Sequence, residues 1–226
     1  MRNTQRDVVS GSLLIGGSVA GMLVMSLHPT ARDIITAENF RRLAQLNVMV
    51  HGVALVAVPV LFLGLLGLAR RLGPSELTTA GLVAYGFGGG ALISAAVASG
   101  FVGTAVIERM LAAEGESRGV YEALLAYAGL VNQGFAKVDV VASSAAILLW
   151  SAAILRSGRM ARAPGVAGAV VGAGVLLAFL SGQLRLDVHG FGIVTLAQSG
   201  WLIWLGILLC RDGGRWMGHG SATLER

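Results

Sequence analysis

The chain has 226 residues, of which 55% are hydrophobic and only 13% are charged, and its formal net charge is +5. Soluble domains carry about 25% charged residues, so this composition excludes an ordinary soluble domain and indicates an integral membrane protein. One cysteine, Cys210, excludes a disulfide framework. The basic residues are scattered arginines rather than a basic run, so the bilayer, and no nucleic acid, is the expected partner.

Six apolar stretches are long enough to cross a membrane as helices, which takes about 20 residues. The first stretch ends without a small-x-small cleavage pattern, so we expect a retained helix rather than a signal peptide. The predicted fold is an all-α membrane domain, a bundle of six transmembrane helices within residues 1–226. These helices cover residues 8–27, 49–69, 79–106, 138–155, 165–184 and 191–210.

Two further segments, residues 36–47 and 121–130, are predicted to lie along the outer surface before the helices that follow them. In the first of them Phe40 and Leu43 recur at helical spacing opposite Arg41. Such amphipathic segments suit the boundary between water and lipid.

The arginines predict the orientation of the bundle. The connectors on one side carry ten arginines and four acidic residues, whereas those on the other side carry six arginines and seven acidic residues. The positive-inside rule places the first set, together with both chain termini, in the cytoplasm. The expected location is a bacterial-type inner membrane, crossed several times.

Glycine is the other compositional outlier, with 33 residues. The pairs Gly17/Gly21 and Gly168/Gly172 and the run 86–90 are typical of close contacts between membrane helices. The same helices offer surfaces for a homo-oligomer.

Three histidines are predicted to share one depth at the outer end of the bundle: His28, His51 and His189. We predict them as metal ligands, because imidazoles with a carboxylate suit zinc, copper or iron. A single haem with two axial histidines is a further cofactor option. The local signatures HxxxH and HExxH are absent, so this hypothesis depends on the shared depth alone.

The fourth predicted helix carries a polar face that must point into the bundle or a wet cavity. One stripe of this face holds Asn132, Asp139 and Ser143 within about 40°, and a neighbouring stripe holds Gln133, the single lysine Lys137, and Ser144. We assign acid–base candidates and ligand-binding candidates from these and other outer polar residues. The first group is Asp139, Lys137 and Glu108, and the second is Asn132, Gln133, Asp187 and Gln198.

Three functions fit this pattern. The first is a metal- or haem-binding membrane protein with redox or hydrolytic chemistry, taking a small-molecule or lipid ligand from the outer side. The second is a small transporter or channel with an outer vestibule lined by the fourth helix. The third is a non-catalytic accessory subunit. The sequence leaves open whether the protein is an enzyme.

Overall fold

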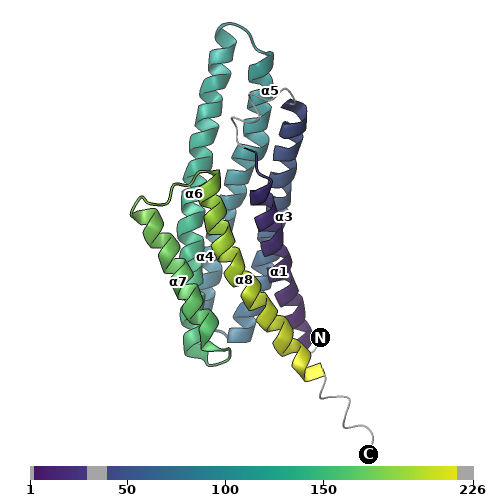
Figure 1. The fold of residues 1–226 in the computed structure, drawn as a ribbon, viewed down its shortest axis with the longest axis vertical. Helices are drawn as coiled ribbons and strands as arrows, with labels where there is room; N and C mark the ends of the chain where they lie inside the picture. Colours follow the sequence, from purple (N-terminus) through teal and green to yellow (C-terminus); the bar gives the residue numbers. More distant parts are fainter. Residues whose placement is uncertain (1–2, 30–39, 218–226) are drawn as a thin grey trace, which may run out of the picture.

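The computed structural model describes residues 3–29 and 40–217, and this part of the chain forms helices and no strands (Figure 1). The helices are α1 (Asn3–Ser26), α3 (Phe40–Leu72), α4 (Glu76–Ala96), the π-helix η1 (Val97–Gly103), α5 (Thr104–Ala112), α6 (Glu116–Ser157), α7 (Arg162–Leu180) and α8 (Val188–Met217). Because α4, η1 and α5 follow one another without a break, the described chain has six helices that are long and apolar enough to cross a membrane. The predicted all-helical fold with six helices able to span a membrane is confirmed, whereas insertion into a membrane and cytoplasmic termini stay predictions.

The helices pack in a ring whose order is α8, α1, α3, α4, α6 and α7. α1 lies between α3 and α8, and α4 lies against α6. We call the end of the bundle where α1 finishes the histidine end, and the opposite end, where α1 begins, the arginine end.

Three parts of the bundle are longer than a membrane requires: α3, the continuous column from α4 to α5, and α6. The column from α4 to α5 has 37 residues and α6 has 42, so α6 is about 63 Å long against a hydrocarbon core of about 30 Å. These columns and α3 rise beyond α1, α7 and α8 at the histidine end (Figure 1).

The projection changes the interpretation of the two predicted surface segments. Residues 121–130 belong to the uninterrupted helix α6, and residues 40–47 are the first turns of α3. Residues 36–39 lie outside the described part of the chain. Alanine, leucine and glutamate, which are strong helix formers, continue each helix past the point where the apolar pattern weakens.

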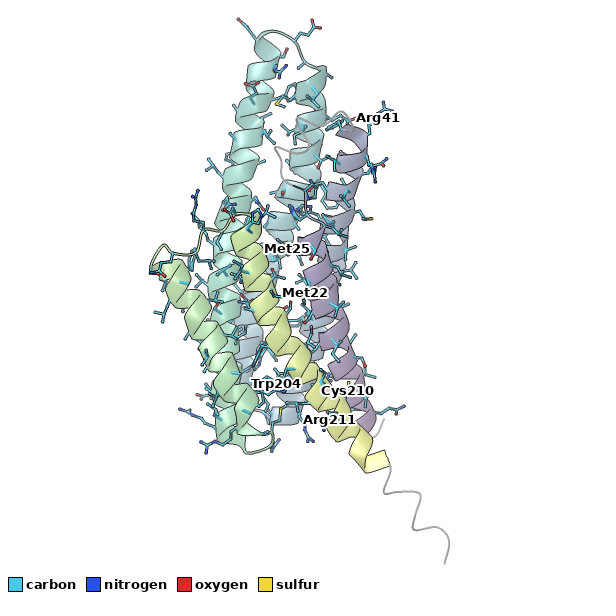
Figure 2. The ribbon with its side chains drawn as sticks, viewed as in Figure 1. Met22, Met25, Arg41, Trp204, Cys210 and Arg211 are labelled. Carbon is cyan, nitrogen blue, oxygen red and sulfur yellow. The ribbon has the colours of Figure 1, made fainter. Side chains whose placement is uncertain are left out.

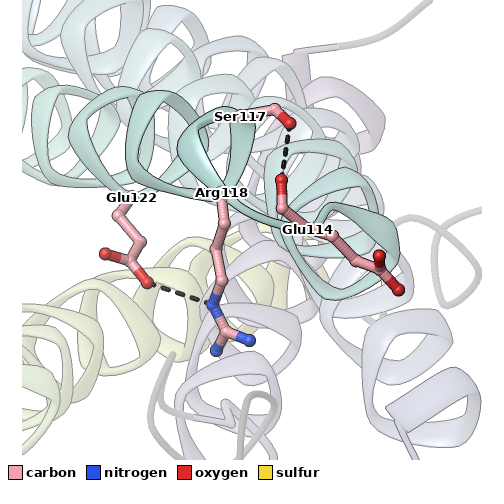
Figure 3. A network of polar contacts seen from close by, with 4 residues as sticks. All are labelled: Glu114, Ser117, Arg118 and Glu122. Atoms are coloured by element: carbon pink, nitrogen blue, oxygen red, sulfur yellow. Dashed lines mark hydrogen bonds and ion pairs between the residues drawn. The ribbon is translucent and has the colours of Figure 1, made fainter.

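The tip of the projection is the turn between α5 and α6. Gly115 has a φ of +57°, a conformation that favours glycine. The Ser117 hydroxyl donates to the Glu114 carbonyl at 2.8 Å, and Arg118 Nε donates to Glu122 Oε1 at 3.2 Å (Figure 3). Both side chains of this ion pair are exposed, so the pair adds little stability.

The half of the bundle towards the arginine end is filled by an apolar core. Leu14, Leu65, Trp150, Ile154 and Leu205 are fully buried there, on four different helices. This core fixes the ring of helices, and the buried polar side chains Asn47, His51 and Thr104 lie beyond it, towards the histidine end.

Candidate functional site

His28 and His51 face each other at the histidine end of the bundle. His28 follows the end of α1, His51 lies in α3, and their Nε2 atoms are 3.2 Å apart. The ring centroids are 4.7 Å apart and the ring planes are inclined by 69°. Two of the three histidines predicted to share one depth are therefore in direct contact.

The other nitrogen of each ring is tied to a backbone carbonyl. His28 Nδ1 lies 2.8 Å from the Pro29 oxygen, and His51 Nδ1 lies 2.7 Å from the Asn47 oxygen. A carbonyl oxygen can only accept, so each Nδ1 carries the hydrogen and donates it. A neutral histidine has one N–H, and both Nε2 atoms are then lone pairs that point towards each other. This arrangement is favourable only with a proton or a metal cation between them.

Burial favours the neutral form of His28, in which the imidazole can act as a ligand. His51 is only 6% exposed. Burial lowers the pKa of His28 below its usual range, although the hydrogen bond to the Pro29 carbonyl acts in the opposite direction. At neutral pH the His28 imidazole is therefore uncharged and its Nε2 lone pair is available.

The π-helix η1 supports His51 from the side. Gly100 of η1 lies directly against the Cβ and ring of His51, in the space that a side chain would fill. Asn47 Nδ2 donates to Thr104 Oγ1 at 2.9 Å and to the Ser99 carbonyl at 3.3 Å. The Thr104 hydroxyl in turn donates to the Gly100 carbonyl at 2.7 Å. π-Helical segments are frequent at functional sites, and this one locks the turn of α3 whose carbonyl orients His51.

A cavity of about 120 Å³ opens beside the two imidazoles. Its polar or sulfur-bearing lining residues, besides the histidines, are Met25, Ser99, Asn132, Gln133 and Asp187. Gln133 Nε2 donates to the Leu186 carbonyl at 3.0 Å, which ties the connection between α7 and α8 to α6. The cavity is thus formed by α1, α3, the end of α4, η1, α6 and the start of α8.

Three of the predicted ligand-binding residues, Asn132, Gln133 and Asp187, line the same cavity as His28 and His51. Asp187 also has a structural role, because its Oδ1 accepts from the Gly190 backbone N–H at 2.9 Å and so caps the start of α8. That hydrogen bond lowers the pKa of the Asp187 carboxyl.

Other predicted site residues lie elsewhere. His189 lines a neighbouring groove that it shares with His28, but it does not line the cavity. Glu108 is exposed on α5. Lys137 is exposed in an apolar groove beside Phe87 and Phe179, away from the histidines.

The remaining two predicted residues, Asp139 and Gln198, lie between helices. Asp139 is 7% exposed, and its Oδ1 lies against Gly88 where α4 and α6 approach closely. Gln198 Nε2 donates to Ser143 Oγ at 3.1 Å and to Ser144 Oγ at 3.3 Å, joining α8 to α6. The predicted polar face of α6 is therefore buried at Asp139, Ser143 and Ser144, but Lys137 falls outside it.

The histidine end offers two adjacent imidazoles but no larger group of metal ligands among the described residues. In the described part of the chain, no group of three or more histidine, cysteine, aspartate or glutamate side chains is placed to hold a metal ion. A bis-histidine haem does not fit this pair, because the porphyrin plane would have to pass between two nitrogens that are 3.2 Å apart. The cavity is also far smaller than the roughly 300–1,000 Å³ typical of cofactor sites.

Three residues of this site were not singled out from the sequence. Asn47 precedes His51 by one helical turn, and Met25 precedes His28 by nearly one turn, so helical spacing was a usable signal for both. Gly100 gave no such signal, because its role depends on the π-helical path of η1.

Comparison of the chain with protein-family models, curated proteins and solved structures found no match. The functional argument therefore depends on the geometry of the site itself.

Proposed function

We propose that this multi-pass membrane protein binds a transition-metal ion between His28 and His51. The observation that carries the proposal is the 3.2 Å separation of two Nε2 atoms whose partner Nδ1 atoms are both engaged with carbonyls. Two imidazole nitrogens bound to one tetrahedral ion at about 2.0–2.1 Å lie roughly 3.3 Å apart. The pair therefore has the spacing of two ligands, and a cation would remove the repulsion between their lone pairs.

The neighbouring side chains favour a soft ion, and we propose copper(I). Met22 and Met25 of α1 and His28 just beyond it recur at three-residue spacing, and Figure 2 shows the two methionines along the upper part of this helix. Met25 lines the histidine cavity, and thioether sulfur selects copper(I) over harder ions. Asn132 and Gln133 also line this cavity, whose open space could hold an exchangeable ligand of the metal ion.

The arginine distribution supports a site that opens to the non-cytoplasmic side of an inner membrane. The proposed role is to capture the metal ion or to change its oxidation state at that face. Structural metal sites are closed by four protein ligands, whereas this site offers two imidazole nitrogens beside an open cavity. The apolar core of the other half of the bundle argues against a continuous ion path through this single chain.

Metal titration of the detergent-purified, chelator-stripped protein tests the proposal. Copper(I), kept reduced, and zinc(II) are each titrated in competition with a chromogenic chelator. We expect one copper(I) ion per chain, and we expect His28→Ala and His51→Ala each to weaken binding by more than the roughly 10–100-fold that loss of an outer-shell partner costs. The matched control is His219→Ala, which changes a histidine outside the described residues.

Two further variants test the preference for copper(I) independently of whether the site binds a metal at all. Met25→Leu should weaken copper(I) but leave zinc(II) unchanged, whereas the exposed Met49→Leu should change neither. Equal copper affinity in His28→Ala and His219→Ala would overturn the metal site. Uptake of a single proton by the pair, without binding of either metal, would also overturn it and would assign the pair to proton binding.

A further inference from the structure

A second polar cavity lies at the arginine end, opposite the histidine pair. Its volume is about 390 Å³. Three separate parts of the chain contribute to it: the second turn of α1, the last turn of α3 and the connection between α6 and α7. The charged and hydroxyl-bearing residues that line it are Arg6, Asp7, Ser10, Arg70, Arg71 and Arg159.

The charges around this cavity are unbalanced. Four of the lining residues are arginines, and the single acidic one is Asp7, whose Oδ2 lies 3.7 Å from Arg71 Nη1. Guanidinium groups stay charged at any physiological pH and repel one another at short range. Because Arg71 is paired with Asp7, the positive potential of this space comes from Arg6, Arg70 and Arg159, and an anion would neutralise it.

Close backbone packing holds the arginines around this space. Gly67 of α3 lies directly against the Ser10 side chain, so α1 and α3 approach closely just above Arg6 and Arg70. Gly73 ends α3 with a φ of +88°, and the Arg159 guanidinium packs against it from the connection between α6 and α7. The negative end of the α3 dipole attracts one such cation, but it does not offset the charges of Arg6, Arg70 and Arg159.

We infer that this cavity binds a phosphate group, and that the headgroup of an anionic phospholipid is its main source. Arginine binds phosphate through two parallel N–H···O bonds, which suits a cavity whose positive charges all come from arginines. Arg6 and Arg70 lie at the ends of membrane-spanning helices, where headgroups lie, and the neighbouring Val9 is 46% exposed, as a residue beside acyl chains would be. Basic pockets between helices on the cytoplasmic side are typical sites for anionic lipids. This inference is independent of the metal site.

Lipid binding to the purified, delipidated full chain tests the inference. Phosphatidylglycerol, phosphatidylcholine and inorganic phosphate are each added, and binding is followed by native mass spectrometry and by thermal unfolding in detergent. We expect the wild type to prefer phosphatidylglycerol. One basic residue near a headgroup contributes about fivefold in affinity, so the double variant Arg70→Gln/Arg159→Gln should bind about 25-fold more weakly.

Two controls keep the result interpretable. Arg156→Gln/Arg162→Gln removes two exposed arginines at the same end that do not line the cavity, and its affinity should stay within about twofold of wild type. Arg70→Lys/Arg159→Lys keeps the charge and should recover part of the binding, which excludes misfolding as the cause of a loss. Equal losses in the cavity and control variants, or no preference for phosphatidylglycerol over phosphatidylcholine, would overturn the inference. Binding of inorganic phosphate alone, abolished in the cavity variant, would retain the phosphate site but overturn its assignment to lipid.

Discussion

Gly100 lies so close to His51 that a methyl group on the glycine would overlap the histidine's Cβ and ring. His51 can therefore keep its position only while residue 100 is glycine. We predict that Gly100→Ala displaces the imidazole, lowers the free energy of unfolding by about 1–3 kcal/mol, and weakens metal binding by about tenfold or more. Chelator competition and thermal unfolding measure the two effects. Gly90→Ala on the same helical column is the control, because its added methyl would meet no atom within 4 Å. Equal behaviour of the two variants would refute the close-packing argument.

Asn47 and Thr104 should stabilise the bundle jointly, through the hydrogen bond between them. Asn47→Ala and Thr104→Val each remove one partner of the 2.9 Å bond in a buried setting. We expect each to lower the free energy of unfolding by about 1–2 kcal/mol, and the double variant to lose less than the sum of the two by about 0.5–1.5 kcal/mol. A double-mutant cycle in detergent measures this coupling. The exposed Thr79→Val should have no comparable effect, and strict additivity would contradict the bond's importance.

Gln198 should matter for stability but not for ligand binding. Its amide joins α8 to Ser143 and Ser144 of α6, and it does not line the histidine cavity. Gln198→Leu is therefore expected to lower the free energy of unfolding by about 0.6–2 kcal/mol, as other hydrogen bonds between membrane helices do. The metal affinity should stay unchanged. A selective loss of metal binding in a variant of normal stability would return Gln198 to the site, as the sequence had suggested.

Lys137 should be dispensable for metal binding. Its side chain is exposed in an apolar groove beside Phe87 and does not line the histidine cavity. We predict that Lys137→Gln changes copper(I) affinity by less than about twofold, because exposed charges at a distance are largely screened. A tenfold change would show that the lysine reaches the site in solution.

Cysteine labelling should test both the orientation and the projection. In a Cys210→Ser background, Arg118→Cys places a thiol near the tip between α5 and α6, and Arg156→Cys places one at the arginine end. A membrane-impermeant maleimide added to intact cells should label the first variant and not the second, because the arginine-rich side is predicted to be cytoplasmic. The opposite labelling pattern would invert the topology and put the histidine cavity on the cytoplasmic side.

The number and type of helices could be predicted because each apolar run is long enough to need a membrane. Their lengths could not. Where an apolar run ends, as before Val138, the membrane signal disappears, but alanine and leucine keep the helix going back to Glu116. Hydropathy reports the lipid boundary, whereas backbone hydrogen bonding decides where a helix begins.

The site was predicted in part for a similar reason. His28 and His51 meet because α1 and α3 are neighbours in sequence and pack together. His189 sits on the first turn of α8, and its rotation about that helix, which depth alone does not specify, directs it to the adjacent groove. The predicted polar face of α6 covered nearly half of the helix circumference. A face that broad includes both the buried stripe and the exposed edge where Lys137 lies.

The π-helix η1 makes the support of His51 depend on the number of residues between α4 and α5. A π-helical turn holds about one residue more than an α-helical turn, so deleting one residue from Val97–Gly103 would allow the whole column to become a regular α-helix. The additional residue is absorbed within η1, so α5 and the tip of the projection would keep about the same direction after the deletion. The wide turn that brings Gly100 against His51 would be lost. Loss of a single codon here would therefore spare the bundle but remove the support for His51, and a codon gained in an ancestral α-helix would have been enough to create it.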